Sequence, residues 1–164
     1  TPVDFCVVIV GDGPALGASR RLAETLGLNG VIVFTGYLTG EALWSQVADF
    51  DIGVIPDPMN VFNDKLSMNK VFEYSAFGIP SVGYALHETK RMLGDVGTFA
   101  ADNTPAGLAD AMARLIDDEP QRIAKGLAAR RLAAEKFDWA NEKRRLMAVY
   151  DSLIGTGDHV GATQ

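Results

Sequence analysis

The stretch FCVVIVGDGPALGASRRLAETLGLNGVIVFTG, residues 5–36, decides the fold class of this chain. It begins with an apolar run at residues 5–10, passes through a glycine-rich turn, continues with helix-forming residues at 19–26 and returns to an apolar run at 31–34. Short apolar runs rich in β-branched residues are typical of buried strands. Two such runs joined by one helix predict a β-α-β unit, in which the two strands are parallel.

The same alternation of apolar runs and helical segments continues along the chain. Further strands are expected at residues 52–55, 81–84 and 98–100, and further helices at 41–48, 68–77, 88–93 and 105–116. C-terminal helices are expected at 121–137 and 140–154, followed by a disordered tail at 155–164. The pattern predicts an α/β fold, a Rossmann-like open parallel sheet of about five strands with helices on both faces, plus the C-terminal helices.

Two of the expected helices begin with local signals. Thr104 stands before Pro105, and a capping hydroxyl followed by proline at the first helical position is typical of a helix start. Glu119 stands before Pro120 in the same way, although glutamate is a less favoured cap. We therefore expect helices to start at both prolines.

The composition indicates one soluble domain of ordinary globular type. The chain has 164 residues, of which 48% are hydrophobic, and its net charge of −6 argues against a nucleic-acid partner, since phosphate-binding surfaces are basic. The single cysteine, Cys6, lies in an apolar run and is expected to be a buried hydrophobic residue. No apolar run approaches the roughly 18 residues of a membrane span and no signal peptide is evident, so we expect a cytoplasmic protein with no transmembrane segment.

Glycine and polar residues follow the expected strands, at the edge where open parallel sheets bind ligands. Gly11 and Gly13 follow the first strand, Gly36 and Tyr37 follow the second, and a long segment at 56–67 follows the third. The glycine turn fits a dinucleotide-binding motif, but that motif needs an acidic residue at the end of the next strand, where this chain has none. A nicotinamide-dependent oxidoreductase and a non-catalytic nucleotide-binding or regulatory module are therefore kept as alternatives.

The richest stretch is NDKLSMNKVFEYSAFGIP, residues 63–80, in which a polar loop leads into a helix. Apolar residues cover most of the circumference of this helix, so we expect it to be buried. A buried carboxylate needs a partner, so Glu73 either pairs with Lys70 one turn earlier or faces a wet cleft. In the cleft, Glu73 would accept hydrogen bonds from a ribose diol while the helix start, residues 67–70, faces a diphosphate.

Five segments of the chain together resemble a known family. They are VGDGP at 10–14, VFTGY at 33–37, DIGVIP at 51–56, NKVFEYSAFGIP at 69–80 and FDW at 137–139. In this order they resemble the C-terminal, donor-binding domain of the GT-B-fold, family 4 (group 1) retaining glycosyltransferases. The segment 69–80 is the most specific of the five.

The resemblance implies that a sugar is transferred from a nucleotide-diphosphate sugar, a UDP- or GDP-sugar, to an acceptor. The anomeric configuration would be retained, and no metal or other cofactor would be required. Glu73 matches a family glutamate that binds the ribose hydroxyls. The backbone around Gly36 and Tyr37 would hold the base, and Glu88 would border the donor cleft.

At one motif position this chain departs from the family. A second glutamate should precede Glu73 by eight positions, and that position is Lys65. The change leaves open which group contacts the transferred sugar, and Asp64 is a candidate for one sugar hydroxyl. Lys65 and Lys70 are candidate catalytic residues, because the departing diphosphate develops negative charge that fixed cations stabilise. The helix start that would face the diphosphate contributes Ser67, Met68 and Asn69.

Residues 1–154 are thus expected to form the nucleotide-sugar-binding half of a two-domain enzyme, beginning at what resembles the second strand of that half. The partner would be an N-terminal acceptor-binding domain, through which peripheral membrane contact is possible. In the family the last helix crosses back to that domain, which offers a role for Trp139 and residues 140–154, whereas the alternative is that Trp139 packs on its own domain. Without its first strand-helix unit and its partner, the isolated chain is expected to bind nucleotide weakly and to be inactive.

Overall fold

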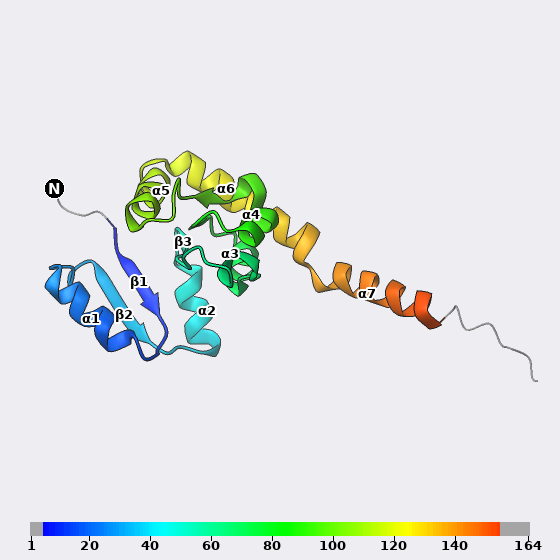
Figure 1. Cartoon of the computed structure of the whole chain (residues 1–164), viewed down its shortest axis with the longest axis horizontal. Helices are drawn as coiled ribbons and strands as arrows, with labels where there is room; N and C mark the ends of the chain where they lie inside the picture. Colours follow the sequence, from blue (N-terminus) through cyan, green and yellow to red (C-terminus); the bar gives the residue numbers. More distant parts are fainter. Residues whose placement is uncertain (1–4, 155–164) are drawn as a thin grey trace, which may run out of the picture. The chain divides into compact units, whose positions relative to one another are not determined.

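The computed structural model of the chain describes residues 5–154 (Figure 1). The chain forms two compact units, Thr1–Asp49 and Phe50–Gln164. Both units contain parallel strands that alternate with helices, as the sequence predicts. The tail expected to be disordered, residues 155–164, lies outside the described residues.

The first unit is the β-α-β unit predicted from the opening stretch, followed by one further helix. β1 (Val7–Val10) pairs in parallel with β2 (Ile32–Gly36), and α1 (Leu16–Thr25) connects the two strands. α2 (Gly40–Ala48) follows β2. The helix and strands therefore form where the apolar runs and the helix-forming residues place them.

Few side chains of the first unit are buried. Arg20 fastens α1 to β2, because its Nη2 donates to the Phe34 carbonyl oxygen at 3.3 Å and its guanidinium lies 5.0 Å from the centre of the Phe34 ring. Among the described residues of this unit, Ala23 and Val47 are the buried hydrophobic side chains. The expectation that Cys6 is buried is wrong, since it precedes the paired part of β1 and its side chain is exposed.

The second unit contains three parallel strands and most of the helices. β3 (Gly53–Ile55), β4 (Ser81–Gly83) and β5 (Thr98–Phe99) are hydrogen-bonded in the order β3-β4-β5. The α-helices are α3 (Asn69–Phe77), α4 (His87–Leu93), α5 (Pro105–Asp117), α6 (Glu119–Leu132) and α7 (Trp139–Ile154). The short helical turns are η1 (Asn63–Lys65), η2 (Gly94–Val96) and η3 (Ala133–Phe137), of which the last is π-helical.

The α/β class is confirmed, but the sheet differs from the single one of about five strands that was expected. All five strands form, and they divide between a two-stranded and a three-stranded sheet. Apolar periodicity reports where a strand lies in the sequence, whereas its neighbours depend on backbone hydrogen bonds between distant segments. The strands were therefore predicted and their grouping was not.

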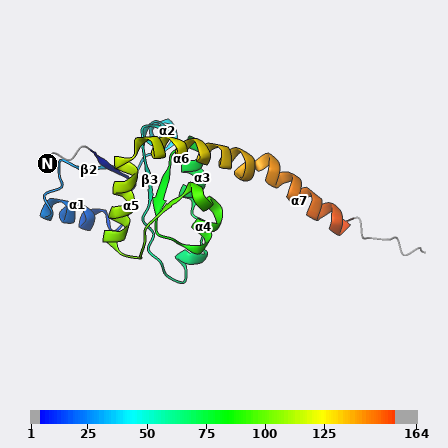
Figure 2. The ribbon, with the colours of Figure 1, turned by 90° about the horizontal axis from the view of Figure 1, so that it is seen from above.

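β4 lies at the centre of the second unit. Ser81, Val82 and Gly83 are all buried, and Val82 is 0% exposed. β4 pairs with β3 on one side and with β5 on the other, so its backbone is hydrogen-bonded along both edges. In Figure 2, α5 lies on one side of these strands and α3 and α4 lie on the other. The core residues Ile55, Val71, Leu86 and Leu115, each at most 2% exposed, fill the layers between them.

Two glycines of the second unit permit close packing around α3. A Cβ added to Gly53 on β3 would lie 2.3 Å from Cδ2 of Tyr74, so the tyrosine ring packs directly on the strand. A Cβ added to Gly126 on α6 would lie 2.4 Å from the carbonyl oxygen of Gly78, so α6 crosses closely over the end of α3. Both positions therefore require a residue without a side chain.

The two helix starts expected at prolines are present, with one change of cap. Thr104 Oγ1 accepts a hydrogen bond from the Gly107 amide at 3.0 Å, as expected. At the second start the cap is Asp118, whose Oδ1 accepts from the Gln121 amide at 2.9 Å, and Glu119 is already helical. Asp118 is the cap in place of Glu119 because its short carboxylate reaches the free amides of the first turn.

The C-terminal helices follow the expected course with an added π-helical turn. Residues 121–137 were expected as one helix, but α6 ends at Leu132 and η3 carries the chain to Phe137. The Phe137 ring packs edge-to-face on Phe72 of α3, with ring centres 4.9 Å apart.

Trp139 is 67% exposed, which contradicts the alternative that it packs on its own domain. Among residues 5–154, no helix is both long and apolar enough to cross a membrane.

Replacing Gly126 by alanine should destabilise the second unit. The new methyl group would meet a backbone carbonyl oxygen that cannot rotate away, and overpacking of this kind lowers the free energy of unfolding by about 1–3 kcal/mol. Urea denaturation followed by circular dichroism would measure the change. Gly30→Ala is the control, because a Cβ at Gly30 meets nothing within 4 Å. Equal stability of the Gly126→Ala variant and the parent chain would contradict the close crossing of α6 over α3.

Candidate functional site

The segment between β3 and α3 is held in shape by asparagine side chains. Asn60 Oδ1 accepts hydrogen bonds from the amides of Phe62 and Asn63 at 3.0 and 2.8 Å. Asn63 Nδ2 donates to the Pro58 carbonyl oxygen at 2.8 Å. These side chains therefore satisfy several backbone groups of the loop and hold it in a defined conformation before η1.

The same loop is tied to the connection that follows β5. The Met59 amide donates to Asn103 Oδ1 at 2.7 Å, and Asn103 Nδ2 donates back to the Met59 carbonyl oxygen at 3.5 Å. Parallel strands end at the same edge of a sheet, so residues that are distant in sequence meet there. The loop after β3 is thus held from outside as well as from within.

Asp64 joins this loop to the connection that follows β4. Its Oδ1 accepts a hydrogen bond from the His87 amide at 2.8 Å, at the start of α4. A cavity of about 410 Å³ lies beside this contact, lined by Asp64, Ala85, His87, Lys90 and Arg91. One oxygen of Asp64, a residue considered for a sugar hydroxyl, is therefore occupied by the protein itself.

Glu88 and Arg91 form an ion pair along α4. The Glu88 carboxylate accepts from Arg91 Nε at 3.0 Å and from Nη2 at 2.8 Å. These hydrogen bonds from Arg91 lower the pKa of Glu88 below its ordinary value of 4.5, and the charge of Arg91 acts in the same direction. Glu88 is ionised at neutral pH, and its oxygens already have a protein partner.

Glu73 lies on an exposed side of α3. The expectation that this helix is buried on most of its circumference is wrong, because Val71 and Ser75 are its buried residues while Phe72 and Phe77 are 37% and 38% exposed. Glu73 itself is exposed, and no ion pair joins it to Lys70 within residues 5–154. The carboxylate is therefore free to meet a ligand. Its charge adds to the effect of burial, which raises the pKa of the neighbouring Tyr74.

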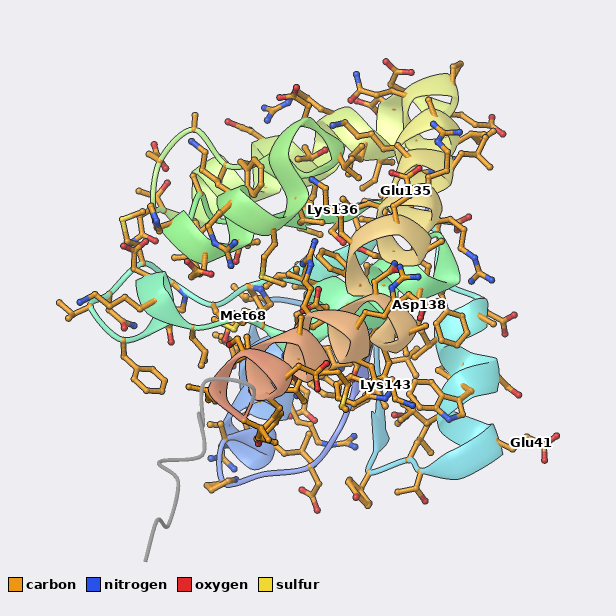
Figure 3. All side chains as sticks on the ribbon, turned by 90° about the vertical axis from the view of Figure 1, so that its right-hand side faces the viewer. Glu41, Met68, Glu135, Lys136, Asp138 and Lys143 are labelled. Carbon is orange, nitrogen blue, oxygen red and sulfur yellow. The ribbon has the colours of Figure 1, made fainter. Side chains whose placement is uncertain are left out.

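The start of α3 is accessible apart from one buried side chain. Met68, the residue before α3, is 5% exposed and packs into the core (Figure 3). Lys65, at the end of η1, and Ser67, Asn69 and Lys70 are exposed. The two lysines and the free amides of the first turn thus lie on one short segment, where they combine positive charge with hydrogen-bond donors.

The four candidate residues of the first unit lie around the ends of β1 and β2. The Gly11 amide donates to the Gly36 carbonyl oxygen at 2.8 Å, and both glycines have positive φ angles, 139° and 75°. Gly13 donates its amide to Asp12 Oδ1 at 2.7 Å, and Tyr37 is 75% exposed. Gly11 and Gly36 therefore already have a role in the turn, because such φ angles favour glycine.

Several residues that shape this edge were missed by the sequence analysis. Asn60 and Asn103 fix the loop after β3, and the His87 amide holds Asp64. Asp57, between two prolines directly after β3, was also overlooked, although Pro-Asp-Pro following a strand is a recognisable turn signal. Within the described residues, no group of three or more His, Cys, Asp or Glu side chains is placed to hold a metal ion.

Comparison with known proteins shows the family. The family model described as "Glycosyl transferases group 1" matches residues 1–118 of the 164. The chain belongs to the group 1 glycosyltransferases. This confirms the family suggested by the five segments of the sequence.

Individual relatives agree with the family match. D-inositol 3-phosphate glycosyltransferase of Corynebacterium kroppenstedtii is 31% identical over 141 residues, which cover 85% of this chain and 30% of that protein. GDP-mannose-dependent alpha-(1-6)-phosphatidylinositol monomannoside mannosyltransferase of Mycolicibacterium smegmatis is 29% identical over 147 residues, covering 87% of this chain and 38% of that protein. The chain therefore spans 30–38% of the length of these two relatives.

The fold is shared with a solved structure. Sucrose-phosphate synthase from Thermosynechococcus elongatus superposes with a TM-score of 0.70 at 20% sequence identity, covering 92% of this chain and 39% of that protein. At this level of identity the likeness concerns the fold. It agrees with the α/β architecture expected of a GT-B glycosyltransferase domain.

The Glu88–Arg91 pair should be visible in a pH titration. Because Arg91 lowers the pKa of Glu88, the pair stabilises α4 above the ordinary glutamate pKa, and this stabilisation is lost as the pH falls through the lowered value. Carbon-13 NMR of the Glu88 carboxyl should give a lower midpoint in the parent chain than in Arg91→Leu. Lys90→Leu, which removes a neighbouring cation, should leave the midpoint nearly unchanged. A midpoint insensitive to Arg91→Leu would contradict the pair in solution.

Proposed function

We propose that the chain is the donor-binding domain of a family 4 retaining glycosyltransferase, which transfers a sugar from a nucleotide-diphosphate sugar to an acceptor. The observation that carries the proposal is the group 1 family match, which spans both units and includes the exposed Glu73 on α3. The Mycolicibacterium smegmatis relative is named as GDP-mannose-dependent, which supports a nucleotide sugar as donor. The donor in this proposal is a UDP- or GDP-sugar.

In this proposal Glu73 holds the ribose. It is exposed, has no ion pair with Lys70 in the described chain and stands in the second turn of α3, so both carboxylate oxygens are available to a diol. A carboxylate that accepts hydrogen bonds from two hydroxyl groups makes charge-assisted contacts, which are stronger than neutral ones. Glu88, whose oxygens are taken by Arg91, borders the site through this ion pair, because Arg91 lines the cavity beside Asp64.

The diphosphate is proposed to bind at the start of α3. Cleavage of the bond between the sugar and the phosphate leaves negative charge on the departing diphosphate, and fixed positive groups stabilise that charge in the transition state. Lys65 and Lys70 supply the cations, and Ser67, Met68 and Asn69 supply the free end of the helix. This assignment requires no metal ion for charge neutralisation.

The first unit is proposed to contribute to binding of the nucleotide through its glycine turns. Gly11 and Gly36 lie at the ends of β1 and β2 and adopt positive φ angles. Because glycine has no Cβ, a ligand can approach the backbone closely at these positions. Gly13 and the exposed Tyr37 flank these turns. The tyrosine ring offers a flat apolar surface for a base.

The residues that bind the acceptor are proposed to lie in an N-terminal acceptor-binding domain, which belongs to the remainder of the transferase. The chain spans 30–38% of the two relatives' length, so their complete activities depend on residues that have no counterpart here. α7 has no buried residue in the described chain and exposes Leu146, Met147, Tyr150 and Leu153, which suits a helix that packs on another domain. The cytoplasmic location, peripheral membrane contact through the other domain and the inactivity of the isolated chain stay predictions.

Replacing Glu73 by alanine should weaken binding of UDP or GDP, whichever is the natural nucleotide, by about tenfold or more, since a hydrogen bond to a charged group contributes about 1.5–3 kcal/mol. Titration of the chain with UDP, GDP and NADH, followed by NMR, would measure the affinities. Glu135→Ala is the control, because Glu135 is exposed and lies on η3 (Figure 3).

The same titration separates the proposal from its alternatives. Unchanged UDP and GDP affinity in Glu73→Ala would show that Glu73 does not hold the ribose. Preferential binding of NADH would favour the oxidoreductase class, against the family match. Binding of a nucleotide without any response to added sugar nucleotides would favour a regulatory module.

A further inference from the structure

Asp57 carries a carboxylate oxygen without a protein partner at the edge of the sheet. It stands two residues after β3 ends at Ile55, and its side chain is partly buried. Its Oδ2 is buried and accepts no hydrogen bond within the described residues. A carboxylate oxygen removed from water is unfavourable unless a donor faces it, so this atom requires a partner.

The local backbone does not supply that partner. An aspartate side chain in a loop usually accepts from the amide two residues later, but the Met59 amide is engaged by Asn103 Oδ1 at 2.7 Å. The next residue in the chain, Pro58, has no amide hydrogen to donate. Neither of the next two residues therefore donates a backbone amide to Asp57, Pro58 because it has no amide hydrogen and Met59 because its amide is engaged by Asn103.

The backbone conformation of the loop around Asp57 is also restrained. Pro56 and Pro58 flank it, and a residue that precedes proline is confined to extended backbone conformations. The Pro58 carbonyl oxygen accepts from the side chains of Asn60 and Asn63 at 3.3 and 2.8 Å. A carboxylate in such a frame is positioned in advance for a ligand.

The other aspartate of this loop, Asp64, uses one of its oxygens within the protein. Asp64 Oδ1 accepts from the His87 amide and links η1 to α4. Lys65 stands next to it and bears a positive charge, which cannot accept a hydrogen bond from a hydroxyl. Asp64 thus uses one oxygen to hold the fold, whereas Oδ2 of Asp57 is a buried oxygen for which no donor is present among the described residues.

We propose that Asp57 accepts a hydrogen bond from a hydroxyl group of the transferred sugar, an inference that rests on the proposed function. The sugar ring is the part of the donor richest in hydroxyl donors. The diphosphate oxygens are acceptors with negative charge, so they repel a carboxylate rather than pair with it. Asp57 therefore contributes to recognition of the sugar, whereas Glu73 contributes to recognition of the nucleotide.

The test compares each nucleoside diphosphate with its sugar conjugate. The affinities of the 164-residue chain for UDP, UDP-glucose, GDP and GDP-mannose would be measured by NMR titration, together with those of Asp57→Asn and Asp57→Ala. Asp110→Asn is the matched control, since Asp110 is exposed on α5. In Asp57→Asn the affinity for the sugar nucleotide should fall about tenfold, and in Asp57→Ala at least as far, while the affinity for the nucleoside diphosphate stays within about twofold. Glu73→Ala should weaken both.

Thermal unfolding gives a second readout. Removing the charge of an unpartnered buried carboxylate should leave the unfolding midpoint of Asp57→Asn unchanged or raise it. A lower midpoint would mean that Asp57 serves the fold, and the proposal would fail. Equal weakening of UDP and UDP-glucose would place Asp57 at the nucleotide instead, and unchanged affinities would remove it from the site. If the parent chain binds none of the four compounds, the proposed function fails, and the inference fails with it.

Discussion

The second unit depends on the buried pairing of β4 with a strand on each side. Val82 is fully inaccessible, and a Cβ on Gly83 would lie 2.7 Å from the Ile55 carbonyl oxygen, so the strands and their registers leave no room for adjustment. Because all three strands are parallel, their carboxyl ends meet at one edge. The contacts of the candidate site that join the connections after β3, β4 and β5 follow from that arrangement.

At that edge, side chains of the connections replace the regular hydrogen bonds of the strands. Asn103 holds the loop after β3, and Asp64 holds the start of α4. These contacts join three connections that are far apart in the sequence into one polar surface. The sheet positions a site of this kind, and the residues of the loops determine which groups it presents. This arrangement suits a family whose relatives bear the names of different sugar-transferring enzymes.

The site also illustrates how a fold retains unsatisfied groups for a ligand. Glu73 stays exposed on α3, and Asp57 keeps a buried oxygen for which the chain provides no donor within its described residues. In contrast, Asp64 and Glu88 have partners in the protein. The sequence predicted Glu73 for the ribose, Asp64 for a sugar hydroxyl and Glu88 for the border of the cleft. The tertiary contacts separate Glu73, which has no ion pair with Lys70 in the described chain, from Glu88, which is paired with Arg91, and from Asp64, one oxygen of which is engaged. Asp57 was not predicted, because its lack of a partner depends on the engagement of the Met59 amide by a distant side chain.

The sequence by itself determined the alternation of strands and helices, the family and the cap at Thr104, because these depend on local periodicity, on motif order and on residues within one turn. The tertiary structure decided which strands pair, how much of α3 is buried and which loop residues meet. These depend on contacts between residues that are tens of positions apart, such as Met59 with Asn103. Local sequence carries no record of such distant contacts, since the same apolar run pairs with whichever strand the complete fold brings beside it.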